Sequence, residues 1–306
     1  MLAITGASGF IGHYVADRLP CQQRRLTRRM HMPSSSGCVW MRGDLQQHDC
    51  IPEFIANAKT LIHLACESNP RSALSDMSAD IYTNLISTVR LFEAFARENS
   101  EGHIIFSSSG GNMYDDTPDR ILRTEEDMPH PRSCYAAHKL AAENCLRLCC
   151  EQYGIRGTVL RISNPYGVFL PKQRTQGLIG VAFSKLFENE PLNVFDSLET
   201  VRDYVHLSDV AKAFNLVIQN PPDSGECRVF HVSSGVGHSI SQVLSTIEEA
   251  TQKSIIRNVS NSISRPSWSV LCPQKIERTL GWVPQVNFYD GIQQMGNEQT
   301  VRQNVH

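Results

Sequence analysis

The sequence contains no apolar run long enough to cross a bilayer. Its longest apolar stretches, Thr60–Cys66 and Ile179–Phe183, are far shorter than the ~20 residues that a membrane-spanning helix needs. A large excess of charge of one sign is also missing. The chain has 29 Lys and Arg residues and 31 Asp and Glu residues, so its formal net charge is -2. No positive surplus is available to neutralise a nucleic-acid backbone. We therefore expect no membrane insertion and no nucleic-acid partner.

Cysteine pairs with metal-binding spacing are absent too. The 10 cysteines are scattered and none forms a Cys-x-x-Cys pair. Met1–Thr5 runs directly into a glycine-rich turn, and no basic region followed by an apolar core and cleavage site is visible. These features predict a cytoplasmic protein with reduced thiols and no metal site. Most of the cysteines, including Cys145, Cys149 and Cys150, are expected to pack as small apolar residues.

The chain does contain a regular alternation of β-like and helical patterns up to about residue 165, which is typical of a parallel sheet covered on both faces by helices. With 306 residues, it is long enough for one large domain or two modest ones. The expected strands are Leu2–Thr5, Arg24–Thr27, Val39–Arg42, Thr60–Leu64, His103–Ser107 and Gly157–Ile162. The expected helices are Phe10–Leu19, Gln46–Asn57, Asp80–Glu98 and Cys134–Tyr153. The predicted fold class is therefore α/β, with a doubly wound parallel (Rossmann) sheet at residues 1–165.

From Asn164 onward prolines and glycines break the chain into shorter pieces, which predicts a smaller mixed α/β lobe over residues 166–306. One strand, Arg228–Val232, could return to the main sheet. The other strands expected here are Leu192–Phe195 and Ser254–Val259. The expected helices are Gln176–Glu188, Ser208–Gln219, Ile240–Thr251 and Pro273–Leu280.

A glycine motif lies between the first strand and the first helix, in the context that a dinucleotide-binding turn requires. Gly6 would permit the tight turn, Gly9 would let backbone N–H groups approach a pyrophosphate, and Gly12 would let the helix pack close to the sheet. The start of the helix would add favourable partial charge for the anion. Glycines at this spacing could also form a plain turn.

The residues after the second and third strands bear on the choice of dinucleotide. No acidic residue that could bind a ribose 2′-OH follows the second strand, where Arg28 and Arg29 stand instead. Two guanidinium groups suit a 2′-phosphate, which favours NADP(H) over NAD(H), although they could be a solvated basic loop. Asp44 and the backbone of Leu45 could meet the adenine ring. Asp44 could also cap a helix that begins at Gln46.

A Tyr-x-x-x-Lys pair, Tyr135 and Lys139, lies at helical spacing, so both side chains share one helix face. Ser107–Ser109 precedes it at the end of an expected strand. With the amino-terminal glycines, this pattern resembles the extended short-chain dehydrogenase/reductase family, in the branch that acts on nucleotide-diphosphate sugars. The resemblance covers nearly the whole chain and implies a nicotinamide dinucleotide as cofactor.

The resemblance implies a role for each of these residues. Tyr135 would be the acid/base, with its phenolate favoured by Lys139, which would also hold the nicotinamide ribose. Ser109, with Ser108 as the alternative, would bond the reacting sugar oxygen, although Ser107 and Ser108 could simply make hydrogen bonds at the strand end. Phe10, Ile11 and Leu64 would line the cofactor site. His63, beside Leu64, is expected to make a structural hydrogen bond.

Three later positions are similar to the substrate-binding part of the family. Asn164 would contact the sugar diphosphate, or shape the turn before Pro165. Arg202, within the block 201–210, and Arg265 would clamp the diphosphate, because a planar guanidinium fork suits phosphate oxygens. Asp209 is expected to cap or anchor a helix. The segment 280–284 (Leu-Gly-Trp-Val-Pro) is interpreted as packing.

The reaction implied is hydride transfer at a hexose carbon, most plausibly C4. Gly110 and Gly111 stand where dehydratases of the family carry an Asp-Glu pair, which disfavours dehydration. Arg28 and Arg29 favour a reductase that consumes NADPH and converts a nucleotide-linked 4-keto-6-deoxyhexose to the deoxysugar for surface polysaccharide. The alternatives are an NAD-dependent nucleotide-sugar 4-epimerase and, more remotely, a non-catalytic dinucleotide sensor. By analogy with relatives, a homodimer is expected through the helices 80–98 and 134–153.

Overall fold

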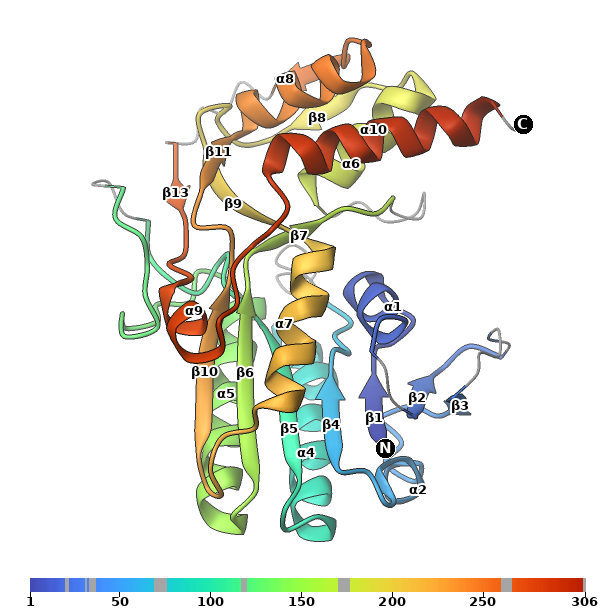
Figure 1. Ribbon diagram of the computed structural model, residues 1–306, viewed down its shortest axis with the longest axis vertical. Coiled ribbons are helices and arrows are strands. Elements are labelled where there is room, and N and C mark those ends of the chain that lie inside the picture. The colour runs from blue at the N-terminus through green and yellow to red at the C-terminus, as the bar shows by residue number, and fades with distance from the viewer. Residues whose placement is uncertain are drawn as a thin grey trace.

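The large lobe of the computed structural model is a seven-stranded parallel sheet in the order β10-β6-β5-β4-β1-β2-β3 (Figure 1). The structure describes residues 1–19, 22–30, 32, 37–68, 76–116, 120–169, 177–259 and 266–304, with side chains up to 298. The strands of this sheet are β1 (Leu2–Thr5), β2 (Gln23–Thr27), β3 (Cys38–Arg42), β4 (Thr60–His63), β5 (His103–Ser109), β6 (Arg156–Ile162) and β10 (Cys227–Val232). This is the doubly wound α/β fold that the alternating pattern predicts.

Helices cover both faces of this sheet because its strands are apolar on both sides. In β1, Leu2 and Ile4 point into one apolar core, whereas Ala3 points into the other. The first core is closed by α1 (Phe10–Ala16) and α7 (Leu207–Gln219), and the second by α2 (Ile51–Ile55), α4 (Ser87–Glu98) and α5 (Cys134–Tyr153). Thus α7 and β10 pack with the large sheet although they follow residue 165.

Two expected helices differ from the structure. The helix expected at 46–57 is wrong in its first half, because residues 45–47 form a turn and α2 begins only at Ile51, next to Pro52. Between them His48 has a positive φ of 59°, which an α-helix does not allow. The helix expected at 80–98 is instead a longer helical run, α3 (Met77–Asp80), the π-helical segment η2 (Ile81–Ile86) and α4. It begins earlier because the Asp76 side chain caps it by accepting from Ala79 N.

The smaller lobe is a separate layer of short strands and helices above the large sheet in Figure 1. Its core contains residues of α6 (Leu178–Glu188), α8 (Ile240–Thr251) and α10 (Phe288–Asn304). Its strands are β7 (Asn164–Tyr166), β8 (Leu192–Val194), β9 (Val201–His206), β11 (Gly237–Ser239), β12 (Arg257–Val259) and β13 (Trp268–Ser269), of which β9 pairs with β7, β11 and β13. The short helix α9 (Gln274–Leu280) lies below, where Ile276 joins the core of the large sheet.

Helix α10 and strand β9 had not been expected. In α10, Phe288, Ile292 and Met295 recur at helical spacing and are buried in the small lobe. The spacing of these three residues indicates a helix, but the residues between them are mostly polar and obscure the pattern. In the part of the chain that the structure describes, no helix has the length and apolar character required to cross a bilayer.

Candidate active site

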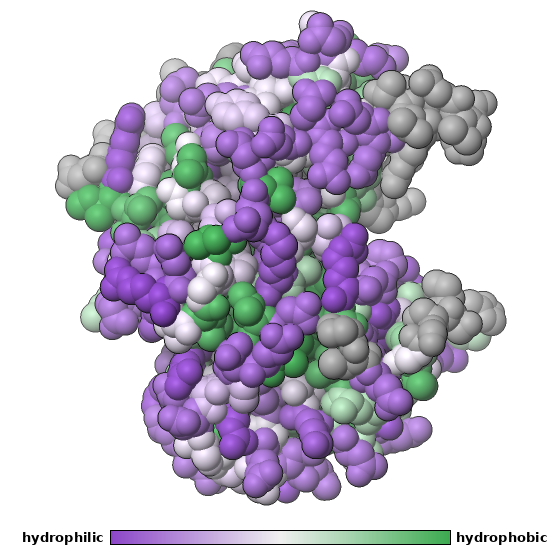
Figure 2. Space-filling view, in the orientation of Figure 1, coloured by the Kyte–Doolittle hydropathy of each residue, from purple (hydrophilic) through white to green (hydrophobic). Residues whose placement is uncertain are grey.

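A cavity of about 670 Å³ opens at the carboxyl ends of the strands of the large sheet. This is where ligands bind in doubly wound folds, and the volume lies within the ~300–1,000 Å³ range of ligand pockets. Residues that follow β1, β2, β3, β4, β5 and β6 all contribute to its wall, together with helix α5. The space-filling view shows the two lobes as separate bulges with a notch between them on the right (Figure 2).

The glycine turn after β1 forms one wall of this cavity. Gly6 has a φ of 68°, and a Cβ atom there would lie only 2.5 Å from Ala65 N. Gly12 is equally constrained, because its Cβ would overlap the Gly6 carbonyl. Gly9 N donates to Gly6 O at 2.9 Å and closes the turn, and Phe10 and Ile11 line the cavity beside it. At its glycines the turn therefore presents backbone, without a side chain, to a ligand in the cavity.

Gly6→Ala is expected to lower the free energy of unfolding by about 1–3 kcal/mol more than Gly37→Ala does. Both glycines have positive φ, 68° and 76°, so both variants carry the same left-handed strain. Only Gly6 faces a backbone, whereas a Cβ at Gly37 meets nothing within 4 Å. Urea titration of the two variants measures the difference. Equal losses would mean that the chain passing Gly6 can move away.

The arginines after β2 lie at the cavity wall, but one already has an anionic partner. The Arg28 guanidinium forms an ion pair with the Glu67 carboxylate, and both side chains are partly exposed. The backbone N–H of Arg29 donates to Thr27 Oγ1 at 3.2 Å. A 2′-phosphate would therefore compete with Glu67 for Arg28.

Asp44 and Leu45, after β3, also line the cavity. Asp44 Oδ1 accepts from Gln46 N at 3.0 Å, and its carbonyl accepts from Gln47 N at 3.0 Å. These bonds close a turn, so the interpretation of Asp44 as the cap of a helix beginning at Gln46 is wrong. Helix α2 starts only at Ile51, after the turn at residues 45–47.

Helix α5 carries Tyr135 and Lys139 to the cavity. Ser133 caps this helix by accepting from Ala136 N at 3.1 Å, and Gly154 ends it in a left-handed conformation. Lys139 is buried and its Nζ donates to Ser107 O at 2.9 Å. The same ammonium lies 5.9 Å from the centre of the Tyr135 ring. The two side chains therefore share one face of the helix, with Lys139 fastened to β5.

The three serines at the end of β5 have different surroundings. Ser108 Oγ donates to Glu143 Oε1 at 2.5 Å, and Glu143 also pairs with Arg161 in the interior. Ser107 supplies the carbonyl that holds Lys139. Ser109, at the end of the strand, is only partly buried and lines the cavity. The hydroxyl of Ser108 is thus engaged in a structural bond, which leaves Ser109 as the candidate for ligand binding.

His63, at the end of β4, makes the structural hydrogen bonds expected of it. Its Nδ1 lies 2.7 Å from Thr5 Oγ1 and its Nε2 lies 2.8 Å from Thr88 Oγ1. Complete burial, with the nearby Lys139 charge, lowers the pKa of His63 to about 3. The ring is therefore neutral and both its nitrogens are occupied. Leu64, the next residue, lines the cavity.

The expected substrate residues are only partly brought together. Asn164 lines the cavity, and its Nδ2 donates to Asp203 O at 2.7 Å. Arg202 is not among the lining residues, and its Nη2 donates to Ser267 Oγ at 2.7 Å. Arg265 lies outside the described residues.

The rest of the 201–210 block holds the two lobes together. Asp203 is fully buried and accepts from Ser163 Oγ, Ser234 N and Gly235 N at 2.9–3.0 Å. Its burial raises the pKa of this carboxyl to about 6. Asp209 Oδ2 accepts from the backbone N–H groups of residues 285 and 286, and its carbonyl accepts from Trp282 Nε1. Asp209 is therefore an anchor for the carboxyl-terminal segment, and Trp282 is a packing residue, as expected.

Several cavity residues had not been anticipated. They come from the segment after β4 and from the helical run that follows it, namely Cys66, Glu67, Ser68, Thr83, Asn84, Ser87 and Thr88. The segment after β4 could have been proposed from its place at the carboxyl end of a strand. The helical residues could not, because only the packing of η2 and α4 brings them to the cavity.

The cavity suits a nicotinamide dinucleotide on several grounds. The Gly6–Gly12 turn contributes backbone to the wall at three glycines, and a Cβ at Gly6 or Gly12 would collide with neighbouring backbone. A buried ammonium, that of Lys139, lies beside a phenol at the other end of the lining. The partly exposed Arg28 guanidinium follows β2, and the partly exposed Glu67 carboxylate follows β4. These are donors and charges that a ribose and a diphosphate require.

Comparison with known proteins agrees with this geometry. Residues 2–233 match the NAD dependent epimerase/dehydratase family. The chain is 30% identical over 242 residues to the dTDP-4-dehydro-6-deoxyglucose reductase of Escherichia coli, covering 78% of this chain and 74% of that protein. It is also 30% identical over 312 residues to the UDP-glucose 4-epimerase of Mycolicibacterium smegmatis, covering 94% and 95%.

A solved structure extends the likeness to the fold. The UDP-glucose 4-epimerase of Thermus thermophilus, in complex with NAD, superposes with a TM-score of 0.85 and 26% identity, over 97% of each chain. The family model, the relatives and the fold agree with one another. The chain belongs to the NAD dependent epimerase/dehydratase family of nucleotide-sugar modifying enzymes.

Proposed function

We propose that this protein reduces a nucleotide-diphosphate 4-keto-6-deoxyhexose, for example a dTDP-linked one, to the 4-hydroxy deoxysugar with NADPH. The observation that carries the proposal is the pair Arg28 and Arg29 in the wall of a cavity that also contains Ser109, Tyr135 and Lys139. A 2′-phosphate site favours NADPH, which cells supply as a consumable reductant. The likeness to the E. coli reductase supports the same reaction.

Each residue of the cavity has a separate role in such a reduction. The bound dinucleotide supplies a hydride for the sugar carbonyl carbon. Tyr135 donates its phenolic proton to the carbonyl oxygen as charge develops there, and Ser109 holds that oxygen through its hydroxyl. Lys139, anchored on Ser107 O, stabilises the phenolate that remains. The glycine turn holds the diphosphate of the dinucleotide. Asn164 contacts the diphosphate of the sugar nucleotide.

Dehydration is disfavoured by the residues that follow Ser109. Elimination of water from a sugar needs an acid and a base next to the hydroxyl residue. Gly110 and Gly111 occupy these positions, and a Cβ at Gly110 would overlap the Leu271 side chain. A carboxylate at Gly110 would therefore require the Leu271 side chain to move.

The second candidate function is an NAD-dependent 4-epimerase. It is favoured by the ion pair between Arg28 and Glu67, which puts a carboxylate beside the end of β2, where an acidic residue would bind a ribose 2′-hydroxyl. The mycobacterial epimerase also matches almost the full length of the chain. An epimerase returns the hydride to the same sugar, so it consumes no reductant.

Stoichiometry separates the two candidates. The protein is incubated with freshly made dTDP-4-keto-6-deoxyglucose or with UDP-glucose, each with and without NADPH. We expect one NADPH to be consumed for each deoxysugar formed and no change in UDP-glucose. Conversion of UDP-glucose without loss of NADPH would support the epimerase, and an inert protein in all arms would contradict both.

Replacing Arg28 and Arg29 together by Ala should raise the KM for NADPH about 10- to 100-fold and leave the KM for NADH nearly unchanged. Charge-assisted hydrogen bonds to a phosphate contribute about 1.5–3 kcal/mol, and each 1.4 kcal/mol is about tenfold in affinity. Glu67→Gln is the matched control, because it frees Arg28 and should lower the KM for NADPH. Equal effects on the two cofactors in the double variant would remove the argument for NADPH.

A further inference from the structure

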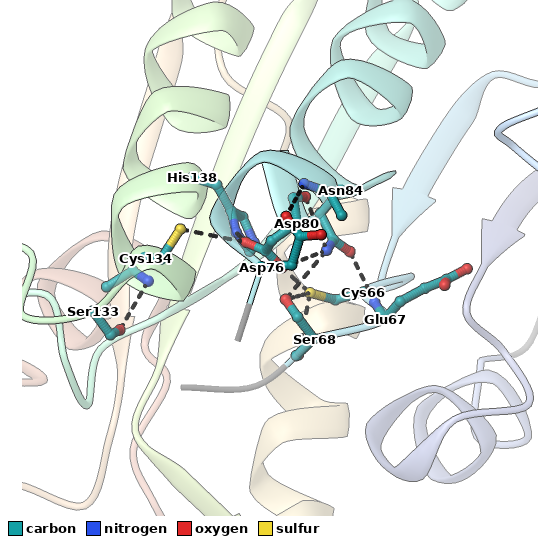
Figure 3. A network of polar contacts seen from close by, with 11 residues as sticks. Cys66, Glu67, Ser68, Asp76, Asp80, Asn84, Ser133, Cys134 and His138 are labelled. Carbon is teal, nitrogen blue, oxygen red and sulfur yellow. Dashed lines mark hydrogen bonds and ion pairs between the residues drawn. The ribbon is translucent and has the colours of Figure 1, made fainter. Parts of the chain in front are cut away.

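Three side chains from three separate elements meet beside the dinucleotide cavity. Cys66 follows β4, Asp80 ends α3, and His138 lies on α5 next to the catalytic Lys139 (Figure 3). Cys66 Sγ lies 3.8 Å from His138 Nε2, and His138 Nδ1 lies 2.7 Å from Asp80 Oδ2. The order is that of a nucleophile, a base and a group that orients the base.

The base is held in the tautomer that can take a proton from sulfur. A carboxylate only accepts, so His138 Nδ1 must carry a hydrogen and donate it to Asp80. His138 Nε2 then points its lone pair at Cys66 Sγ. Both His138 and Asp80 are buried, with side chains 3% exposed.

Asp80 is itself kept ionised by its surroundings. Burial alone would raise the pKa of Asp80, but hydrogen bonds from Ser68, His138 and Asn84 outweigh burial and hold that pKa below its usual value. Asn84 Nδ2 donates to Asp80 Oδ1 at 2.9 Å, and Cys134 Sγ lies 3.7 Å from Oδ2. The negative charge that orients His138 is therefore present at neutral pH.

Cys66 differs from Cys50, another partly exposed cysteine, in the charged groups near its thiol and in lining the cavity. It lines the cavity, and the charged or titratable groups that act on its thiol are Lys139 and His138, both from α5. The Glu67 side chain, next in the chain, points away from it (Figure 3). Burial tends to raise the pKa of its thiol, but Lys139 and the bond to His138 lower it to about 7. By contrast, burial raises the pKa of Cys50, which is also partly exposed.

We propose that Cys66, activated by His138 and Asp80, is a nucleophilic thiol and a modification site for small oxidants of the peroxide class, and that its oxidation blocks the dinucleotide cavity. His138 takes the thiol proton, and the sulfur attacks one oxygen of hydrogen peroxide. The S–O bond forms as the O–O bond breaks, and hydroxide leaves and receives the proton from His138. Sulfur is oxidised to the sulfenic acid and the peroxide is reduced to water.

Blockage follows from the position of the thiol in the wall. Cys66 follows Ala65, whose backbone N would lie only 2.5 Å from a Cβ on Gly6, so the backbone that carries Cys66 passes next to the glycine turn that we assign to the cofactor, and Cys66 lines the same cavity. An added oxygen would occupy cavity space and remove the thiolate charge. Only this part of the proposal rests on the proposed cofactor site.

The reactivity itself is tested by alkylation of the free protein with iodoacetamide at pH 7, followed by mass spectrometry of each cysteine-containing peptide. Cys50 is the internal control, because it is also partly exposed but its Sγ donates to the Asp44 carbonyl and is not paired with a histidine. Cys66 should react roughly tenfold faster than Cys50, given the larger thiolate fraction and the lower intrinsic nucleophilicity of a low-pKa thiol. Equal rates would overturn the proposal whatever reaction the enzyme catalyses.

The roles of the partners are tested by His138→Gln and Asp80→Asn. Each variant should slow the alkylation of Cys66 about tenfold while the rate at Cys50 stays constant. The fully buried Cys150 reports on folding in the same sample, since its peptide becomes alkylated only if the variant opens. A Cys66 rate that is unchanged in a folded variant would exclude activation by that partner.

Peroxide treatment then tests oxidation and blockage. Dimedone trapping should locate the sulfenic acid at Cys66, and NADPH binding, followed by its fluorescence, should weaken at least tenfold. The Cys66→Ser protein should keep the affinity that it has before treatment. Bound NADPH should slow Cys66 alkylation at least tenfold and leave Cys50 unaffected. Fast alkylation without this protection would overturn the claim on the cofactor cavity alone.

Discussion

Replacing Tyr135 by Phe is expected to lower kcat by roughly 10²- to 10⁴-fold, the usual contribution of a positioned acid or base. The change removes one oxygen that lies in the cavity beside Lys139 and Ser109. The α5 helix keeps its cap at Ser133 and its left-handed end at Gly154, so the fold should not change. Steady-state kinetics with the 4-keto sugar and NADPH measure the loss.

A matched control lies on the same helix. Tyr153, in the last turn of α5, accepts a hydrogen bond from Arg97 Nε at 3.4 Å and is not among the cavity-lining residues. Tyr153→Phe should leave kcat within about twofold of the parent, because no group in the cavity loses a partner. Full activity of the Tyr135→Phe protein, or a comparable loss at Tyr153, would contradict the assignment of Tyr135.

The second large effect is on stability and comes from the buried ion pair between Arg161 and Glu143. Arg161→Met should lower the free energy of unfolding by about 3–5 kcal/mol, because it leaves the Glu143 carboxylate buried without its cation. The two side chains are only 6% and 5% exposed, with Nη2 and Oε2 2.6 Å apart. Arg161 also donates to Tyr114 Oη, so a second buried group loses a bond. Denaturant unfolding measures the change.

Two further variants separate loss of the pair from loss of packing. Arg161→Met with Glu143→Leu should recover most of the stability, because no uncompensated charge remains. Arg147→Met removes an exposed pair with Glu151 on the same helix and should cost at most about 1 kcal/mol. An Arg161→Met protein as stable as Arg147→Met would mean that water reaches the pair.

The fold was predictable from sequence because its signals are local and mutually consistent. The strands of the large sheet are short apolar runs that end at glycines or polar residues. Helix α5 has the predicted bounds, Cys134–Tyr153, and in the structure Ser133 caps its start and Gly154 ends it. Errors arose where a side chain competes with the helix. The Asp44 carboxylate captures Gln46 N and forms a turn, and Asp76 starts the next helical run earlier than apolar periodicity indicates.

The candidate site was predictable to a different degree in its different parts. The glycine turn, Ser109, Tyr135 and Lys139 follow from motifs whose spacing is local, and all of them line one cavity. The ion pair of Arg28 with Glu67 joins residues 39 positions apart, and the contact of Cys66 with His138 joins residues 72 apart. No periodicity reports such pairs, since they depend on the order of strands in the sheet. Arg202 is the opposite case. Its motif is clear in the sequence and predicts a diphosphate contact, but in the structure its guanidinium donates to Ser267.

The central claim, that NADPH hydride is delivered to the sugar in a cavity built by Tyr135 and Lys139, has one direct test. The protein is supplied with dTDP-4-keto-6-deoxyglucose and NADPH that carries deuterium at both C4 positions, and the deoxysugar product is examined by mass spectrometry and NMR. We predict one deuterium at C4 of the sugar in every product molecule. A sugar product without deuterium, formed while the labelled NADPH is retained, would contradict the proposed reduction.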